Sequence, residues 1–193
     1  MSWNSRHLCF VIPILALLVA AGQRADAQVK PFKISGGGTA DYIPTQPGQV
    51  PNHISTGQAT ELGNHTGAGS LMLIGQTELG LPLFKSATPY VFTAANGDKL
   101  AFTYGDTTNG AAGPGIVYPA LVGGTPEQPI VVATFDAEFN PYLPLCTGRF
   151  EKVVAGRVRM IAVTAPFKLG DTVDRVAYTW QGEGWLEFKK GKK

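Results

Sequence analysis

Short stretches dominated by apolar and β-branched residues recur along most of the chain, with clusters of turn-forming residues between them. In residues 157–162 the arginines occupy one side of an extended chain and the apolar residues the other, and residues 71–74 form a continuous apolar run between glycines. The first pattern has the period of two that marks a strand with one buried face. Beyond residue 27 we find no sustained apolar period of 3.6, and only a single helical turn fits residues 149–156. The pattern therefore predicts an all-β protein.

Several further segments fit strands, namely residues 90–93, 100–104, 115–122, 129–135, 174–180 and 185–188. The pair Asn96-Gly97 predicts a β-hairpin with a type I′ turn, because both central residues of that turn need positive φ. The run Gly182-Glu183-Gly184 predicts another turn. Strands at this spacing are typical of barrels and sandwiches. We favour a single antiparallel β-barrel of about eight strands, because closure removes the exposed edges of an open sheet.

The first 27 residues have the order of a cleavable signal peptide. Arg6 and His7 make a weakly basic start, residues 8–21 are apolar, and Ala25-Asp26-Ala27 matches a small-x-small cleavage site. A membrane-spanning helix needs about 20 apolar residues, so a retained anchor is the weaker interpretation. We expect cleavage after Ala27, no integral membrane segment in the mature protein, and an exported product that is periplasmic or extracellular.

Residues 28–52 are rich in glycine and proline, including the run Gly36-Gly37-Gly38. Such clusters interrupt both helical and strand periodicity, so they predict a flexible lead-in. The barrel domain is then expected to span residues 53–188. Residues 189–193 form a lysine-rich tail, which is more often a solvated terminus than a contact surface.

Charge and cysteine content narrow the function classes. The chain carries 16 Lys and Arg against 14 Asp and Glu, a formal net charge of +2. Because four of the lysines lie in residues 189–193, the barrel itself presents no basic face of the kind that binds nucleic acid. Cys9 would leave with the signal peptide, so Cys146 would have no partner for an internal disulfide. We expect Cys146 to be buried and inert.

No arrangement of residues predicts a metal centre or a cofactor. Glu61 lies between His53 and His65, but a metal site needs three or four converging ligands, and we expect these histidines to lie in solvent at the ends of a strand. Asp98 is expected to hydrogen-bond the backbone of the hairpin turn. The glycine-rich loop 105–113 lacks the Lys-Ser/Thr end of a phosphate-binding loop.

Six residues are candidates for ligand binding. Arg149 either pairs with Glu151, Asp136 or Glu138 and fixes its segment against the barrel, or binds an anionic ligand at the barrel mouth. The other five are aromatic, and the interior of an eight-stranded barrel is either filled by such side chains or holds one small molecule. The candidates are Phe102, Tyr104, Phe135, Arg149, Tyr178 and Trp180.

Three segments resemble a group of small exported bacterial proteins with the allene oxide cyclase or dirigent type of β-barrel. Residues 92–100 contain an Ala-Asn-Gly-Asp hairpin, residues 147–150 read Thr-Gly-Arg-Phe, and residues 56–63 are similar to the group's first strand. Glu61 replaces the histidine usual in that strand, and Leu145-Cys146 replaces a Gly-Gly pair. The resemblance spans roughly residues 53–188 and implies a barrel of about eight strands with room for an apolar ligand. It implies no particular reaction.

These observations favour an exported, non-catalytic β-barrel that binds an apolar small molecule or a partner in the cell envelope. One alternative is an isomerase or cyclase acting inside the barrel, which needs a dry cavity with a polar group of shifted pKa. Another is an oligomeric structural protein of the envelope, since dirigent-type barrels often form homo-oligomers. The sequence leaves open whether the protein is an enzyme.

Overall fold

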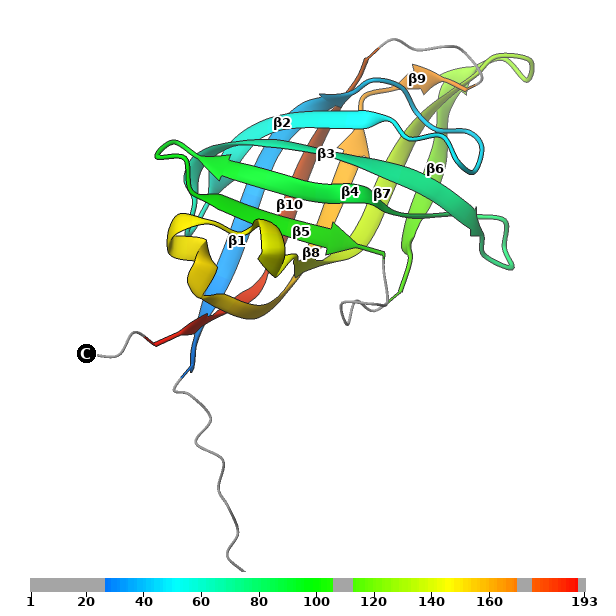
Figure 1. The fold of residues 1–193 in the computed structure, drawn as a ribbon. Coiled ribbons are helices and arrows are strands. Elements are labelled where there is room, and N and C mark those ends of the chain that lie inside the picture. The colour runs from blue at the N-terminus through cyan, green and yellow to red at the C-terminus, as the bar shows by residue number, and fades with distance from the viewer. Residues whose placement is uncertain (1–26, 106–112, 170–174, 191–193) are drawn as a thin grey trace, which may run out of the picture.

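The computed structural model describes residues 27–105, 113–169 and 175–190, which fold as one closed antiparallel β-barrel (Figure 1). Within these ranges there is no α-helix, only two short 3₁₀ helices, η2 (Leu143–Leu145) and η3 (Gly148–Lys152). The prediction of an all-β barrel is confirmed. The strands are β1 (Ala27–Ala40), β2 (Asn52–Ala59), β3 (Gly63–Gln76), β4 (Pro82–Ala94), β5 (Lys99–Tyr104), β6 (Gly115–Gly124), β7 (Pro129–Pro141), β8 (Val153–Thr164), β9 (Phe167–Lys168) and β10 (Val176–Lys189).

The strands occupy eight positions around the barrel. Sequential neighbours pair from β1 to β4 and from β7 to β8, and β10 lies between β8 and β1 and closes the ring. β5 and β6 share the position between β4 and β7: β5 pairs with residues 90–93 of β4, and β6 pairs with residues 83–84. The short β9 pairs with β7. This meander leaves each of the eight positions with a partner on both sides.

The prediction of a flexible lead-in is wrong for residues 28–40, because β1 pairs with β10 along its whole length and with β2 over residues 34–40. Phe32 and Ile34 of β1 are buried in the core. Gly36 and Gly38 follow them on the same face, and a Cβ at either position would meet the backbone of β2. The barrel therefore begins at Ala27 rather than at residue 53. The expected signal peptide lies outside the described residues, apart from Ala27.

The predicted hairpin between β4 and β5 is present, but its turn type differs. The amide of Gly97 donates to the carbonyl of Ala94, and the amide of Ala94 donates to the carbonyl of Asp98. Only Gly97 in this turn has positive φ (87°), so the loop has three residues with glycine in the left-handed position. Asn96 instead accepts a hydrogen bond from the Asp98 amide.

The turn predicted at Gly182-Glu183-Gly184 does not exist, because β10 continues through it to Lys189. A Cβ at Gly184 would collide with the backbone of Arg157 on β8, and one at Gly182 would meet the Met160 side chain. These glycines serve the close approach of two strands rather than a reversal of the chain.

The two ends of the barrel are filled differently. At the end where β1 starts, a cluster of fully buried residues packs together, and η3 lies over it (Figure 1). This cluster, called the packed end below, contains Phe32, Leu100, Phe102, Phe150, Val158 and Leu186. The opposite end, where loop 41–51 connects β1 to β2, contains a cavity and is called the hollow end.

Candidate functional site

The hollow end contains a partly open cavity of about 80 Å³. Side chains of β1–β5, β7, β8 and β10 line it, and Ile43 and Pro44 of loop 41–51 complete the lining. Nearly all of these side chains are apolar or aromatic, and none of them is a Lys, Arg, Asp or Glu. One water needs roughly 10–15 Å³ of such space, so this volume suits a few waters or one small organic ring.

Glycines on the inner face give the large side chains of this end their room. In the strand register Tyr178 lies beside Gly38, and Trp180 lies beside Gly36. Gly67 faces the Tyr90 ring so closely that a Cβ there would collide with it. Alternation of small and large residues is how narrow barrels accommodate aromatic side chains.

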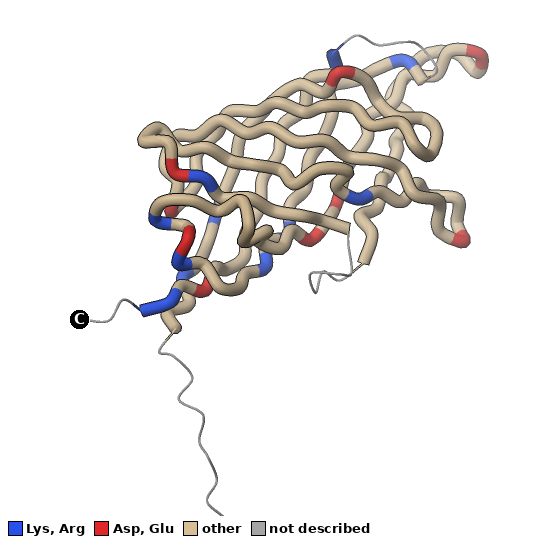
Figure 2. The backbone as a smooth tube through the Cα atoms, in the orientation of Figure 1, with Lys and Arg blue, Asp and Glu red and all other residues tan. Residues whose placement is uncertain are grey.

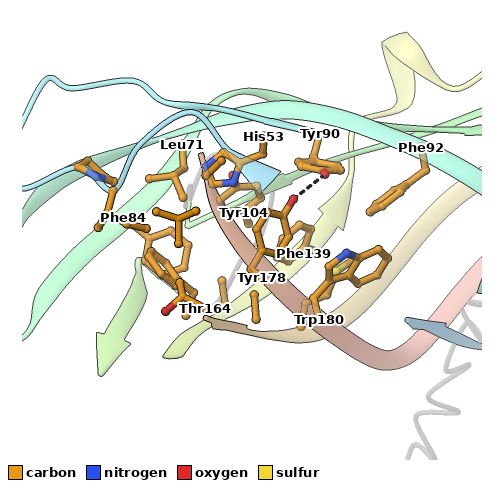
Figure 3. A pocket seen from close by; sticks show the side chains of 18 residues that line it. His53, Leu71, Phe84, Tyr90, Phe92, Tyr104, Phe139, Thr164, Tyr178 and Trp180 are labelled. Atoms are coloured by element: carbon orange, nitrogen blue, oxygen red, sulfur yellow. Dashed lines mark hydrogen bonds between the residues drawn. The ribbon is translucent and has the colours of Figure 1, made fainter. Parts of the chain in front are cut away.

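A hydrogen-bonded cluster of hydroxyls lies at one side of the cavity. Tyr90 donates to Ser55 Oγ at 2.8 Å, and Tyr178 donates to the carbonyl of Ile54 at 3.3 Å. The two tyrosine hydroxyls are themselves 3.3 Å apart (Figure 3). Burial raises the pKa of Tyr90, Tyr104 and Tyr178 above the usual value for tyrosine. All three phenols are therefore neutral at physiological pH.

His53 lines the cavity next to this cluster. Its ring meets Tyr178 edge-on with centroids 5.7 Å apart, and its Nε2 is buried without a hydrogen-bond partner among the described residues. Burial lowers the pKa of His53 to about 4, against an opposing effect of nearby Asp41, so the imidazole is neutral at pH 7. The expectation of a solvated histidine is wrong here, because pairing of β1 with β2 sets His53 opposite buried Ala40.

His65 is buried in the core, which also contradicts the expectation of a solvated histidine. It faces the interior from β3, with its ring edge-on to Phe92 at 5.1 Å and its Nδ1 3.2 Å from the carbonyl of Gly63. Burial lowers the pKa of His65. Glu61 lies in the turn between β2 and β3 and pairs with Lys30 at 3.3 Å, so it is not inside a strand. Across the described ranges no three His, Cys, Asp or Glu side chains gather as metal ligands would.

Of the six predicted ligand-binding residues, the structure brings four together around the cavity: Tyr104, Phe135, Tyr178 and Trp180. Phe102 is fully buried at the packed end, where it contacts Phe32 and does not line the cavity. Sequence reasoning missed His53, Leu71, Phe84 and Tyr90. Alternation along β2 and β4 would have placed His53 with Ser55 and Tyr90 with Phe92, but it does not tell the inner face from the outer one.

Arg149 lies at the packed end, away from the cavity. Its Nε is 3.1 Å from Asp98 Oδ2, while Asp136 pairs with Arg159 and Glu138 pairs with Arg157. None of the three partners expected from the sequence is therefore the one observed. The side-chain hydrogen bond from Asn96, followed by the contacts with Arg149, lowers the pKa of Asp98. Figure 2 shows positive and negative residues interleaved near this end of the barrel.

The segments 92–100 and 147–150 meet at this ion pair. The Thr147 amide donates to the carbonyl of Lys99 at 2.9 Å, and the Lys99 amide donates to Thr147 Oγ1 at 3.1 Å. Gly148 has a φ of 61° and faces the Asp98 carboxylate so closely that a Cβ would collide with it. The contact fixes η3 over the packed end.

Cys146 is buried, as predicted from the sequence, and is a free thiol. Burial raises its pKa, and its Sγ lies 3.9 Å from the carbonyl of Ala101. A thiol that is both buried and held protonated is a poor nucleophile.

Comparison with protein-family models, with curated proteins and with solved structures finds no match. Among the residues that the structure describes, no helix has the length and apolar character needed to cross a bilayer.

Proposed function

We propose that the barrel binds one small, mostly apolar molecule in the cavity at its hollow end. The observation that carries this proposal is a cavity of about 80 Å³ lined by aromatic and aliphatic side chains without a charged residue. Small-molecule sites are concave, largely apolar and furnished with few polar groups. Water gains little in such a space because it finds few hydrogen-bond partners there, so an apolar molecule displaces it readily.

The proposed role is binding without catalysis. The alternative, an isomerase or cyclase, is favoured by one observation, which is the neutral and largely buried His53 in the cavity wall. A general base works best when its pKa lies near the working pH. With a pKa of about 4, His53 would hold an abstracted proton weakly at pH 7, and the tyrosines of the cavity keep their protons.

Filling the cavity tests the proposal. Ala137 lines the cavity from β7, so Ala137→Leu adds three carbon atoms inside it. Titration of ethylbenzene, followed by calorimetry, should show saturable one-to-one binding to the wild type and none to Ala137→Leu. Ala120→Leu on the exposed face of β6 is the matched control and should bind like the wild type. Equal binding by all three proteins, or none by the wild type, would refute the proposal.

We further propose that the protein is exported and that cleavage after Ala27 releases the mature form. The signal-like order of residues 1–27 supports this, and cleavage there would remove only the first residue of β1. Mass spectrometry of protein from the producing cell should find a chain that starts at Gln28 outside the cytoplasm. Recovery of the intact chain from the cytoplasm would contradict it.

An allene oxide cyclase or dirigent type of barrel remains our proposal for the family. Its support is that two of the three segments carrying the resemblance, 92–100 and 147–150, contact each other through the Asp98–Arg149 pair. An envelope partner and a homo-oligomeric structural role are the alternatives to ligand binding. Sizing chromatography with light scattering tests the homo-oligomeric role, because a protein that is a monomer in solution would exclude that role.

A further inference from the structure

Loop 41–51, which connects β1 to β2 at the hollow end, forms part of the cavity wall (Figure 1). Its residues Ile43 and Pro44 line the cavity, and every other lining residue among those that the structure describes belongs to a strand. The strands around the cavity are hydrogen-bonded to neighbours on both sides, and the packed end is filled by fully buried side chains. Of the described lining, only this loop can therefore move without breaking the sheet.

The hydrogen bonds of the loop stay within it. Gln49 Oε1 accepts from the amides of Thr45 at 2.8 Å and Gln46 at 3.2 Å, and the amide of Val50 donates to the Tyr42 hydroxyl at 3.1 Å. Among the described residues, no hydrogen bond formed by residues 42–50 reaches a strand of the barrel. Residues 42–50 are therefore a folded unit of their own.

The two ends of this segment are fixed close together. The amide of Asp41 donates to the carbonyl of Asn52 at 3.0 Å, and the Asn52 side chain donates to Asp41 Oδ2 at 3.0 Å. The flanking residues Ala40 and Pro51 are buried in the barrel. A compact surface loop whose ends meet in this way is an Ω-loop, a form that frequently has a function. The segment between the fixed ends can move as one piece.

Apolar contact holds the segment against the barrel. Pro44 is buried, Ile43 is half-buried against the core, and residues 45–48 are exposed. Apolar contact is non-directional, so its loss leaves no hydrogen bond unmade. Loops held in this way belong to the part of a structure that opens at the lowest free energy. Opening here would uncover two side chains and widen the entrance of a cavity that is already partly open.

We propose that residues 42–50 are a lid, which swings outward as one piece to let a small molecule enter or leave the cavity and closes on it through Ile43 and Pro44. This inference rests on the proposed ligand-binding function and adds how access to that site is controlled. The lid sets the rate at which the ligand exchanges, whereas the strands set the shape of the cavity.

A cysteine inside the cavity measures access to it. Ala137 lines the cavity from β7, so Ala137→Cys puts a thiol there, and Cys146→Ala removes the native thiol of the barrel. Peptide mass spectrometry follows the labelling of position 137 by methyl methanethiosulfonate. The lid is removed by replacing residues 42–51 with Asn-Gly, a two-residue turn that suits the paired residues Asp41 and Asn52. Removal should speed the labelling about tenfold or more, because access no longer waits for opening.

The matched control shortens another connection at the same end. Residues 125–128 join β6 to β7 and do not line the cavity, so their replacement by Asn-Gly should leave the labelling rate unchanged. Ile43→Ala keeps the lid but removes much of its apolar contact, so it should speed the labelling about fivefold. Ile54→Ala, on the exposed face of β2, should not change it. If the chain without the lid does not fold, this pair of point variants decides the question.

The outcomes separate the lid from the proposed function. Labelling at one rate with the lid intact, weakened or removed would overturn the inference, even if ethylbenzene binds the wild type. Calorimetry with ethylbenzene tests the proposed function by itself. If ethylbenzene does not bind the wild type, the proposed function fails, and the inference that the lid serves a ligand fails with it, whatever the labelling rates are.

Discussion

The packed end and the hollow end of the barrel are built by the same strands, yet one is solid and the other contains a cavity. At the packed end Phe32, Phe102 and Phe150 are fully buried, and η3 brings Phe150 in as a plug. At the hollow end the cover is loop 41–51, which contributes Ile43 and Pro44 to the cavity lining instead of a plug.

The difference shows that the filling of a narrow barrel is decided layer by layer. The interior of eight strands is just wide enough for side chains or for one small ligand, so the volumes of a few residues choose between these outcomes. Here the six core residues of the packed end are all apolar, whereas the cavity at the hollow end is lined by the tyrosine hydroxyl cluster and by His53 and Trp180 as well as by apolar side chains. The most tightly packed part of the core and the proposed binding cavity thus lie at opposite ends of the barrel.

The largest expected effect comes from a matched pair of leucine substitutions. Leu100 is fully buried at the packed end, whereas Leu71 lines the cavity. Leu100→Ala should lower the free energy of unfolding by about 4 kcal/mol, because it removes contacts on all sides and opens a new cavity. Leu71→Ala should cost about 2–3 kcal/mol, because one side of Leu71 already faces empty space. Urea unfolding measures both, and equal losses would mean that the two ends are packed alike.

The second-largest expected effect is a loss of stability at acidic pH, which originates at His53 in the hollow end. The unfolded chain binds a proton at His53 up to about pH 6.5, but the folded protein does so only up to about pH 4. Between these values the unfolded state binds more protons, so stability is complete above pH 6.5 and falls as the pH falls toward 4, by on the order of 3 kcal/mol.

His53→Phe should flatten this part of the stability profile, measured by urea unfolding at several pH values. His65, whose pKa is also lowered by burial, would leave a residual slope in that variant. A profile identical to that of the wild type would show that His53 is not buried in its neutral form.

The smallest effect tests the contact that holds η3 over the packed end. Gly148→Ala should destabilise the protein by roughly 1–2 kcal/mol, because a φ of 61° strains an alanine, and because the new Cβ collides with the Asp98 carboxylate. Gly123→Ala on β6 is the control, since it meets open space without positive φ, and its stability should stay within about 0.5 kcal/mol of the wild type. Thermal melts compare the two. If both variants unfold at the same temperature, the contact between Asp98 and the segment of Arg149 does not stabilise the packed end.

Much of the fold could be predicted from the sequence, because the alternation and the turn residues that mark a strand belong to a few consecutive residues. The alternation along 157–162 and the turn residues at 96–97 belong to single segments, and both predict the observed strands β8, β4 and β5. The glycine run 36–38 misled the prediction because glycine signals a turn unless something packs against it. In β1 that partner is the backbone of β2, which pairs with residues 34–40 and lies against Gly36 and Gly38, and the glycine pattern by itself does not reveal this contact.

The sequence by itself determined that this chain forms antiparallel strands, that Cys146 is buried, and that aromatic residues such as Tyr178 and Trp180 share one face of β10. Only the tertiary structure decided that His53 faces the interior, that Arg149 pairs with Asp98, and that one end of the barrel stays hollow. The physical reason is that alternation fixes which residues share a face, whereas register and closure fix which face turns inward and which residues meet across strands.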